Sequence, residues 1–271
     1  MNKVPFALEV DTGQLVDVHE VARGLQCGCI CPSCDTPLQA RQGEKNAWHF
    51  AHATRGTSDQ TDQECEYSFY VSVTQMAKQL FAELAKIKIS LPKYVYPLRI
   101  QYEGYAPLEV DIEVTQASTV QFEKVELETK IESVYGDVIG WVHGVPLIIG
   151  FDHPERHFLI DEPAADKARA GVIRIDLSAT LGCFFGHAGK GVQSFKEQLK
   201  SYLFDSPEHV HWLYHPRRDR AIEWTKTNMP DPASISTQDL FACPEDIPSE
   251  SDQGDFIDRA LAGFTLNRSR R

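Results

Sequence analysis

The segment CGCICPSCDTPLQARQGEKNAWHFAH, residues 27–52, has four cysteines in its first eight residues and ends on two histidines three positions apart. Such a segment suits a disulfide framework, a redox centre or a metal site. The first residues lack the basic start, apolar stretch and cleavage site of a secretory signal, so we expect a cytoplasmic protein. In that reducing compartment a dense cysteine cluster is more often a metal site than a set of disulfides.

Structural zinc is expected at this segment, because zinc takes four sulfur or imidazole ligands that proteins often supply as pairs from tight turns. Cys31 and Cys34 form one pair, and His49 and His52 form a second pair at the same spacing. Cys65 is the alternate ligand that would replace one histidine, and the sequence leaves this choice open. No motif such as HExxH accompanies the cluster, so a closed structural site fits better than a catalytic one.

The composition is that of an ordinary soluble protein, with 42% hydrophobic and 24% charged residues in a chain of 271 residues. No stretch has the apolar length of a membrane span, so we expect no membrane contact. The net charge of −12 has the wrong sign for a protein that coats nucleic acid. DNA binding would therefore depend on a local basic groove or on a partner protein.

Hydrophobic periodicity predicts an α/β domain with a mixed sheet. A hairpin is expected over residues 6–18, and a core-facing helix follows Glu66, with its apolar stripe starting at Phe69. A second helix is predicted over 194–204. Runs rich in β-branched residues predict strands of one central sheet at 107–114, 120–128, 137–142, 146–151 and 171–178, with another strand at 209–214.

The C-terminal segment, residues 225–271, has a different composition. It is rich in proline, serine and aspartate, and no lysine or arginine lies between Lys226 and Arg259. Such a sequence buries too little apolar surface to hold one shape alone. We therefore expect an acidic, mostly flexible tail.

Several stretches together resemble the competence protein CoiA-like family over roughly residues 20–220. They are the Cys/His segment, MAKQL in the first helix, VELE, GDVIGWV, the DH pair, IRIDLS and HWLY. The resemblance implies a zinc-ribbon-like module at residues 1–60. It also implies a nuclease-like domain of the PD-(D/E)XK type at residues 66–222, built as a mixed sheet flanked by helices.

In such a nuclease, acidic residues on two neighbouring strands hold Mg²⁺, and a lysine two residues beyond the second acid assists the reaction. The resemblance assigns the first acid to Asp137 and an upstream acid to Glu128. Matching the family's Thr-His pair to Asp152 and His153 leaves Ile148 at the second acidic position. The stretch VPLIIGFDHPERH also contains no lysine.

The first helix departs from the family pattern too, because Tyr70 and Thr74 replace the expected glutamate and histidine, although Lys78 is retained. Two outcomes follow. Asp152, with His153, reaches the ion from further along the strand and preserves a weakened Mg²⁺ site, or the fold is kept and the chemistry is lost. The second outcome is our expectation.

Three hypotheses for function follow. The first is a CoiA-like protein of DNA processing, uptake-linked recombination or anti-phage defence, whose degenerate nuclease site binds DNA or a partner protein without cutting. The second is an active Mg²⁺-dependent DNA endonuclease that uses Glu128, Asp137 and Asp152. The third is a protein-interaction subunit without nucleic-acid contact, which the acidic composition favours.

Overall fold

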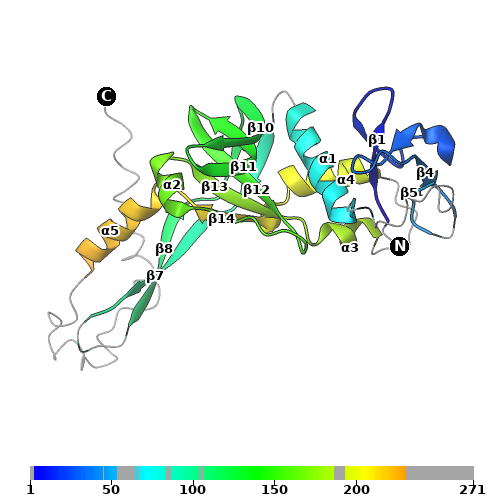
Figure 1. The fold of residues 1–271 in the computed structure, drawn as a ribbon. Helices are drawn as coiled ribbons and strands as arrows, with labels where there is room; N and C mark the ends of the chain where they lie inside the picture. Colours follow the sequence, from blue (N-terminus) through cyan, green and yellow to red (C-terminus); the bar gives the residue numbers. More distant parts are fainter. Residues whose placement is uncertain are drawn as a thin grey trace, which may run out of the picture. The chain divides into compact units, whose positions relative to one another are not determined.

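The computed structural model describes residues 3–44, 46–53, 65, 67–83, 87–102, 104, 107–185 and 193–229 (Figure 1). The chain divides into two compact units, of which the first comprises Met1–Leu98 and Asp111–Glu223 and the second Arg99–Val110 and Trp224–Arg271. All the candidate site residues belong to the first unit. The predicted flexible tail lies outside the described residues from residue 230 onward.

The N-terminal part of the first unit is built from short antiparallel strands. β1 (Phe6–Glu9) pairs with β2 (Leu15–Asp17) and with β3 (Cys29–Ile30), while β4 (Leu38–Arg41) pairs with β5 (His49–His52). The short 3-10 helix η1 (Leu25–Cys27) precedes β3 and ends at Gly28, whose φ of 64° is easily adopted by glycine. The hairpin predicted over residues 6–18 is confirmed.

A five-stranded mixed sheet forms the body of the first unit, in the order β10-β11-β12-β13-β14. These strands are β10 (Lys124–Ile131), β11 (Val134–Val142), β12 (Val145–Asp152), β13 (Gly171–Asp176) and β14 (Val210–Tyr214). β12 and β13 run parallel, whereas the other neighbouring pairs are antiparallel. The prediction of a mixed sheet is therefore confirmed.

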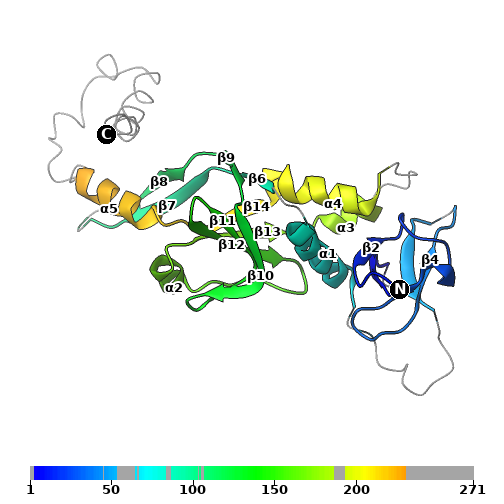
Figure 2. The same cartoon turned by 90° about the horizontal axis from the view of Figure 1, so that it is seen from above.

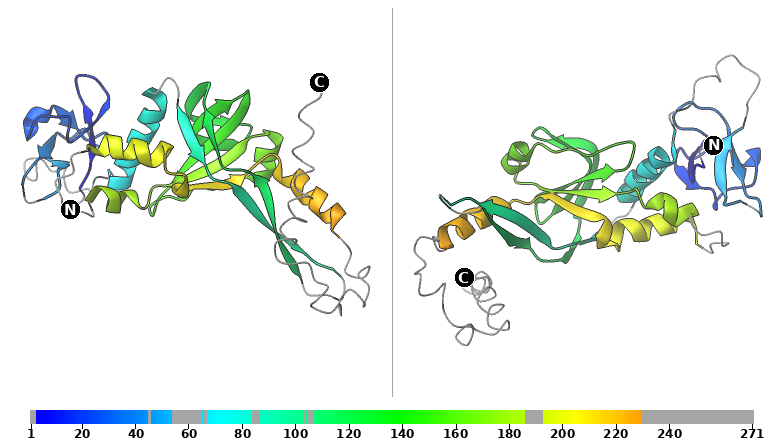
Figure 3. Two further views of the ribbon diagram at one scale, coloured as in Figure 1. Left: turned by 180° about the vertical axis from the view of Figure 1, so that it is seen from behind. Right: turned by 90° about the horizontal axis from the view of Figure 1, so that it is seen from below.

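Helices cover both faces of this sheet. Successive strand residues point to opposite sides, so each face contributes a separate set of side chains to the packing. One face packs in a core with α1 (Phe69–Glu83), α3 (Thr180–Phe185) and α4 (Phe195–Phe204), and includes Val138, Ile149 and Ile173. The other face packs against α2 (Glu162–Lys167) and includes Ile139, Ile148 and Val172. Figure 2 shows α1 and α2 on opposite sides of the strands, and Figure 3 shows α4 beside α1.

The prediction wrongly placed residues 107–114 in the central sheet. Residues 107–114 form β8 (Leu108–Thr115), which pairs with β7 (Tyr94–Ile100) in a separate two-stranded sheet. The physical reason is that β8 exposes Glu109, Asp111 and Glu113 along one side, which a sheet covered on both faces would bury.

The single strand predicted over residues 120–128 is divided in two. Its first part belongs to β9 (Ser118–Gln121), which pairs with β6 (Lys88–Leu91), and its second part to β10. The remaining elements are η2 (Pro207–His209) and α5 (Arg218–Asn228). Within the described residues, no helix combines the length and apolar character needed to cross a bilayer.

Candidate metal centre

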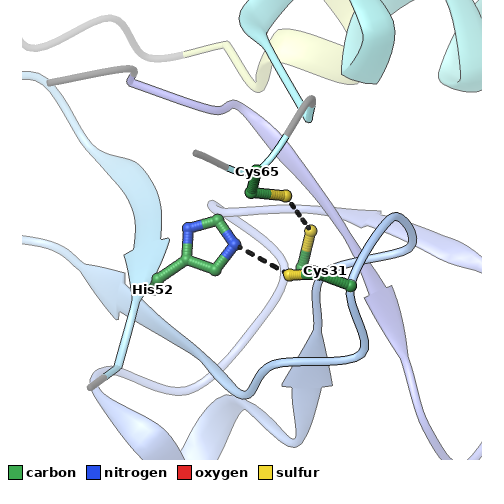
Figure 4. A group of neighbouring side chains, drawn as sticks. Cys31, His52 and Cys65 are labelled. Atoms are coloured by element: carbon green, nitrogen blue, oxygen red, sulfur yellow. Dashed lines mark hydrogen bonds between the residues drawn. The ribbon is translucent and has the colours of Figure 1, made fainter. Parts of the chain in front are cut away.

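Four side chains converge in the N-terminal part of the first unit: Cys31, Cys34, His52 and Cys65. Their donor atoms all lie within 4.8 Å of one another. Cys31 Sγ is 3.4 Å from Cys65 Sγ, and Cys34 Sγ is 3.4 Å from His52 Nε2. Figure 4 shows the His52 ring and the sulfur atoms of Cys31 and Cys65 directed toward a common centre.

This donor set fits a tetrahedral metal ion. Zn–S bonds of about 2.3 Å place two sulfur ligands of a tetrahedral site roughly 3.8 Å apart, close to the 3.4 Å between the Cys31 and Cys65 sulfur atoms. Three cysteines and one histidine are a common structural zinc set, and four protein ligands leave no open position for water. The cluster is therefore able to hold a metal such as zinc in a closed site.

A tight turn after β3 positions the first two cysteine ligands, Cys31 and Cys34. The Cys31 amide donates to the Thr36 carbonyl, and the Asp35 amide donates back to the Cys31 carbonyl, each at 2.9 Å. Asp35 adopts a φ of 55°, a left-handed conformation that aspartate tolerates better than most residues. The turn thus brings the sulfur atoms of Cys31 and Cys34 to the same side.

The last ligand lies just before α1. The Tyr67 backbone amide donates to Cys65 Sγ at 3.4 Å, and the buried Tyr67 hydroxyl donates to the Phe6 carbonyl on β1 at 2.8 Å. Ser68 Oγ then accepts the Val71 amide in the first turn of the helix. A metal held by Cys65 would therefore join the N-terminal strands to the start of α1.

The thiols differ in their ease of ionisation. Burial raises the pKa of Cys31 to about 12, and it also raises the pKa of Cys65. Burial acts in the same direction on Cys34, but hydrogen bonds with Thr36 and with the neighbouring thiols outweigh it and lower the pKa of Cys34 to about 6. A bound cation favours the thiolate form of every cysteine ligand, so metal binding would offset the burial at Cys31 and Cys65.

His49 lies outside the group of four. It is on the same strand as His52, three residues earlier, and residues at odd separations point to opposite faces of a strand. His49 is buried, and its Nδ1 donates to the Ala47 carbonyl at 2.8 Å. The HxxH spacing would bring both rings to one side in a helix, but β5 directs only His52 toward the cysteines.

Three of the four predicted catalytic residues, Asp137, Asp152 and His153, lie on or just after β11 and β12. Asp137 is buried on β11, where its Oδ2 accepts the Phe151 amide and its Oδ1 accepts Arg156, each at 2.9 Å. Both carboxylate oxygens therefore already have protein donors.

Asp152 has a similar set of partners at the end of β12. Its Oδ1 accepts the Phe158 amide at 3.0 Å and His157 Nδ1 at 3.2 Å, while its Oδ2 is 3.4 Å from Arg174. The neighbouring His153 is buried and stacks on Tyr70 of α1, with ring centroids 5.2 Å apart. Burial lowers the pKa of His153.

Glu128 is directed toward α1. The pairs Leu127↔Val138 and Thr129↔Gly136 place Glu128 opposite Asp137 in register, but Glu128 has a φ of 48°. Its carboxylate accepts Lys78 Nζ at 2.7 Å, and this hydrogen bond lowers the pKa of Glu128. Among the described residues, Glu128, Asp137, Asp152 and His153 are not brought together as a group of metal donors.

The position expected for the nuclease lysine is filled by another side chain. Two residues beyond Ile148 lies Gly150, and a Cβ atom added to Gly150 would be 1.9 Å from the Phe158 ring. Phe158 is buried and belongs to the same core as Ile148. Sequence reasoning missed Phe158 and Arg156, although a glycine within a buried strand is a signal that another group approaches closely.

Comparison with known proteins supports the N-terminal resemblance. Residues 18–61 match the family model described as "Competence protein CoiA, N-terminal domain". No curated protein and no solved structure matches the chain. The matched segment contains Cys31, Cys34 and His52 and ends before Cys65. The match therefore supports a CoiA-like relationship for the segment that supplies three of the four candidate ligands.

Proposed function

We propose that this chain is a CoiA-like, competence-associated protein that holds a structural zinc ion and binds DNA without cutting it. The family match and the Cys/His cluster support the first part of the proposal. The contacts of Asp137, Asp152 and Gly150 support the second part, the loss of cleavage.

The observation that carries the loss of cleavage is the ion pair between Asp137 and Arg156. The Asp137 side chain is only 2% exposed, and the guanidinium is 2.9 Å from its Oδ1. Mg²⁺ needs carboxylate oxygens and near-octahedral geometry, so it would have to displace a cation already bound to a buried carboxylate. Displacement would break this charge-assisted hydrogen bond, which opposes entry of the metal ion.

The neighbouring strand β12 offers no substitute carboxylate for a metal ion. Asp152 accepts hydrogen bonds from the Phe158 amide and from Arg174, and Ile148 occupies the position where an acidic residue is expected. The Phe158 ring excludes a lysine at Gly150. A functional nuclease site would thus require both a new metal ligand and a rearrangement of the residues after β12.

Incubation of the full chain with supercoiled plasmid and Mg²⁺ or Mn²⁺ tests the loss of cleavage. We expect intact plasmid with the zinc-loaded wild-type protein. Cleavage by the wild type that disappears in Asp137→Ala would overturn the proposal and establish the Mg²⁺-dependent endonuclease instead. Cleavage that persists unchanged in Asp137→Ala identifies a contaminating nuclease, which further purification must remove.

A salt titration of DNA affinity tests the binding itself. A protein that contacts a few phosphates loses affinity linearly on a logarithmic salt scale, with a slope close to the number of contacts. The net charge of −12 favours a second candidate, a protein-interaction subunit without nucleic-acid contact. Absence of DNA binding at low salt would exclude the first candidate and leave the second.

A further inference from the structure

A hollow of about 340 Å³ opens beside Arg156, between the start of β11 and the residues that follow β12. Its lining includes Tyr135, Arg156, His157, Phe158, Leu159 and Asp161. The volume lies at the lower end of the range of small-ligand sites. It suits one compact ligand and excludes a nucleic-acid duplex.

Two nitrogen-bearing side chains at this hollow are held by carboxylates beneath them. Arg156 pairs with Asp137, and His157 pairs with Asp152 at 3.2 Å. The carboxylate side chains are 2% and 12% exposed, whereas the Arg156 and His157 side chains are 37% and 74% exposed. Asp137 takes one of the five N–H donors of the guanidinium, so Arg156 retains capacity for an anion.

Apolar surface lies next to these side chains. Leu159 is 84% exposed and Tyr135 is 46% exposed, whereas the Phe158 ring is buried. An exposed tyrosine next to an arginine is a typical setting for a nucleobase with its phosphate, because the ring stacks on the base and the guanidinium binds the anion.

The hollow also contains one acidic group, which limits the charge of the ligand. Asp161 is the N-cap of α2 and accepts the Ala164 amide with one carboxylate oxygen. This carboxylate repels additional phosphates but accepts hydrogen bonds from a sugar hydroxyl or a base amino group. A ligand with a single phosphate therefore fits better than a polyphosphate.

We propose that this hollow binds one nucleoside monophosphate group, with the phosphate at Arg156 and His157 and the base against Tyr135 and Leu159. The inference rests on the proposed function and names the ligand of the same region. Where a nuclease would hold a metal ion at Asp137, this chain holds a permanent guanidinium cation. That cation attracts a phosphate but does not activate water, so binding is retained without hydrolysis.

Fluorescence anisotropy with the full, zinc-loaded chain tests this inference. The probe is a 3′-labelled oligothymidylate, and thymidine monophosphate is the competitor. We expect Tyr135→Ala to weaken probe binding about tenfold, since stacking on an aromatic side chain contributes this order of affinity per base. His157→Gln should also weaken probe binding, because it removes the imidazole that Asp152 holds at the hollow. Leu181→Ala, another exposed apolar residue that does not line the hollow, should bind as the wild type does.

The outcomes separate the inference from the proposed function. Competition by thymidine monophosphate identifies a free nucleotide as a ligand, and loss of affinity in the variants without competition identifies a nucleotide within a strand. Wild-type affinity in both Tyr135→Ala and His157→Gln overturns the inference while DNA binding stands. Binding of thymidine monophosphate without any binding of DNA supports the hollow and refutes the proposed function. No binding of either probe refutes both.

Discussion

The Asp17 carboxylate is predicted to be a main attachment between the N-terminal strands and α4. Asp17 is fully buried, its Oδ2 accepts the Lys196 amide at 2.6 Å, and its Oδ1 accepts both the amide and Nδ1 of His19, at 2.8 and 2.7 Å. The His19 ring in turn stacks on Trp48 and meets the edge of Phe195. Replacement of Asp17 by alanine should therefore loosen this contact.

The expected cost follows from the donors that lose their acceptor. A hydrogen bond to a charged acceptor contributes about 1.5–3 kcal/mol. The His19 side chain is 24% exposed and can donate to water instead, so the two backbone amides dominate. Their sum predicts that Asp17→Ala lowers the free energy of unfolding by about 3–6 kcal/mol. Asp17→Asn, which retains one oxygen acceptor, should lie between the wild type and Asp17→Ala.

Urea unfolding of the zinc-loaded chain measures this difference, and hydrogen exchange locates it. The first-turn amides of α4, including Lys196, should exchange faster in Asp17→Ala. Asp11→Ala serves as the matched control, because Asp11 is exposed on the same hairpin and should change stability by less than about 0.5 kcal/mol. A loss below about 1 kcal/mol in Asp17→Ala, or unchanged exchange in α4, would refute the reasoning.

Three further predictions concern the metal, the strand β12 and pH. Cys65→Ser should weaken zinc binding in a chelator competition and speed hydrogen exchange in the first turn of α1, while the exposed Cys183→Ser should do neither. Gly150→Ala should destabilise the protein by about 1–3 kcal/mol because its Cβ overlaps the Phe158 ring, and the double variant with Phe158→Leu should cost less than the sum of the single variants. Burial lowers the pKa of His215 from 6.5 to about 4, so the stability that its neutral ring contributes is complete above pH 6.5 and is lost as the pH falls toward 4. His215→Gln should therefore flatten the pH dependence of the free energy of unfolding between pH 4 and 6.5. An unchanged slope in this window would contradict the assignment.

Local patterns predicted much of the fold. The apolar stripe from Phe69 predicted α1, and four of the five strands of the central sheet were found near their predicted bounds. The apolar periodicity and the β-branched content of a segment are properties of that segment alone, so they predict its secondary structure without knowledge of the elements that pack against it. The same patterns do not specify which strands pair, and β8 was therefore assigned to the wrong sheet.

The sequence by itself determined that Cys31 and Cys34 lie within reach of one metal ion, because CxxC fixes two donors within a single turn. Only the tertiary structure decided that Cys65 completes the group and His49 does not, since strand geometry turns His49 away. Only the tertiary structure showed Arg156 at Asp137 and Phe158 at Gly150. These contacts join side chains from different segments. Local periodicity describes one segment at a time and therefore does not predict contacts between segments.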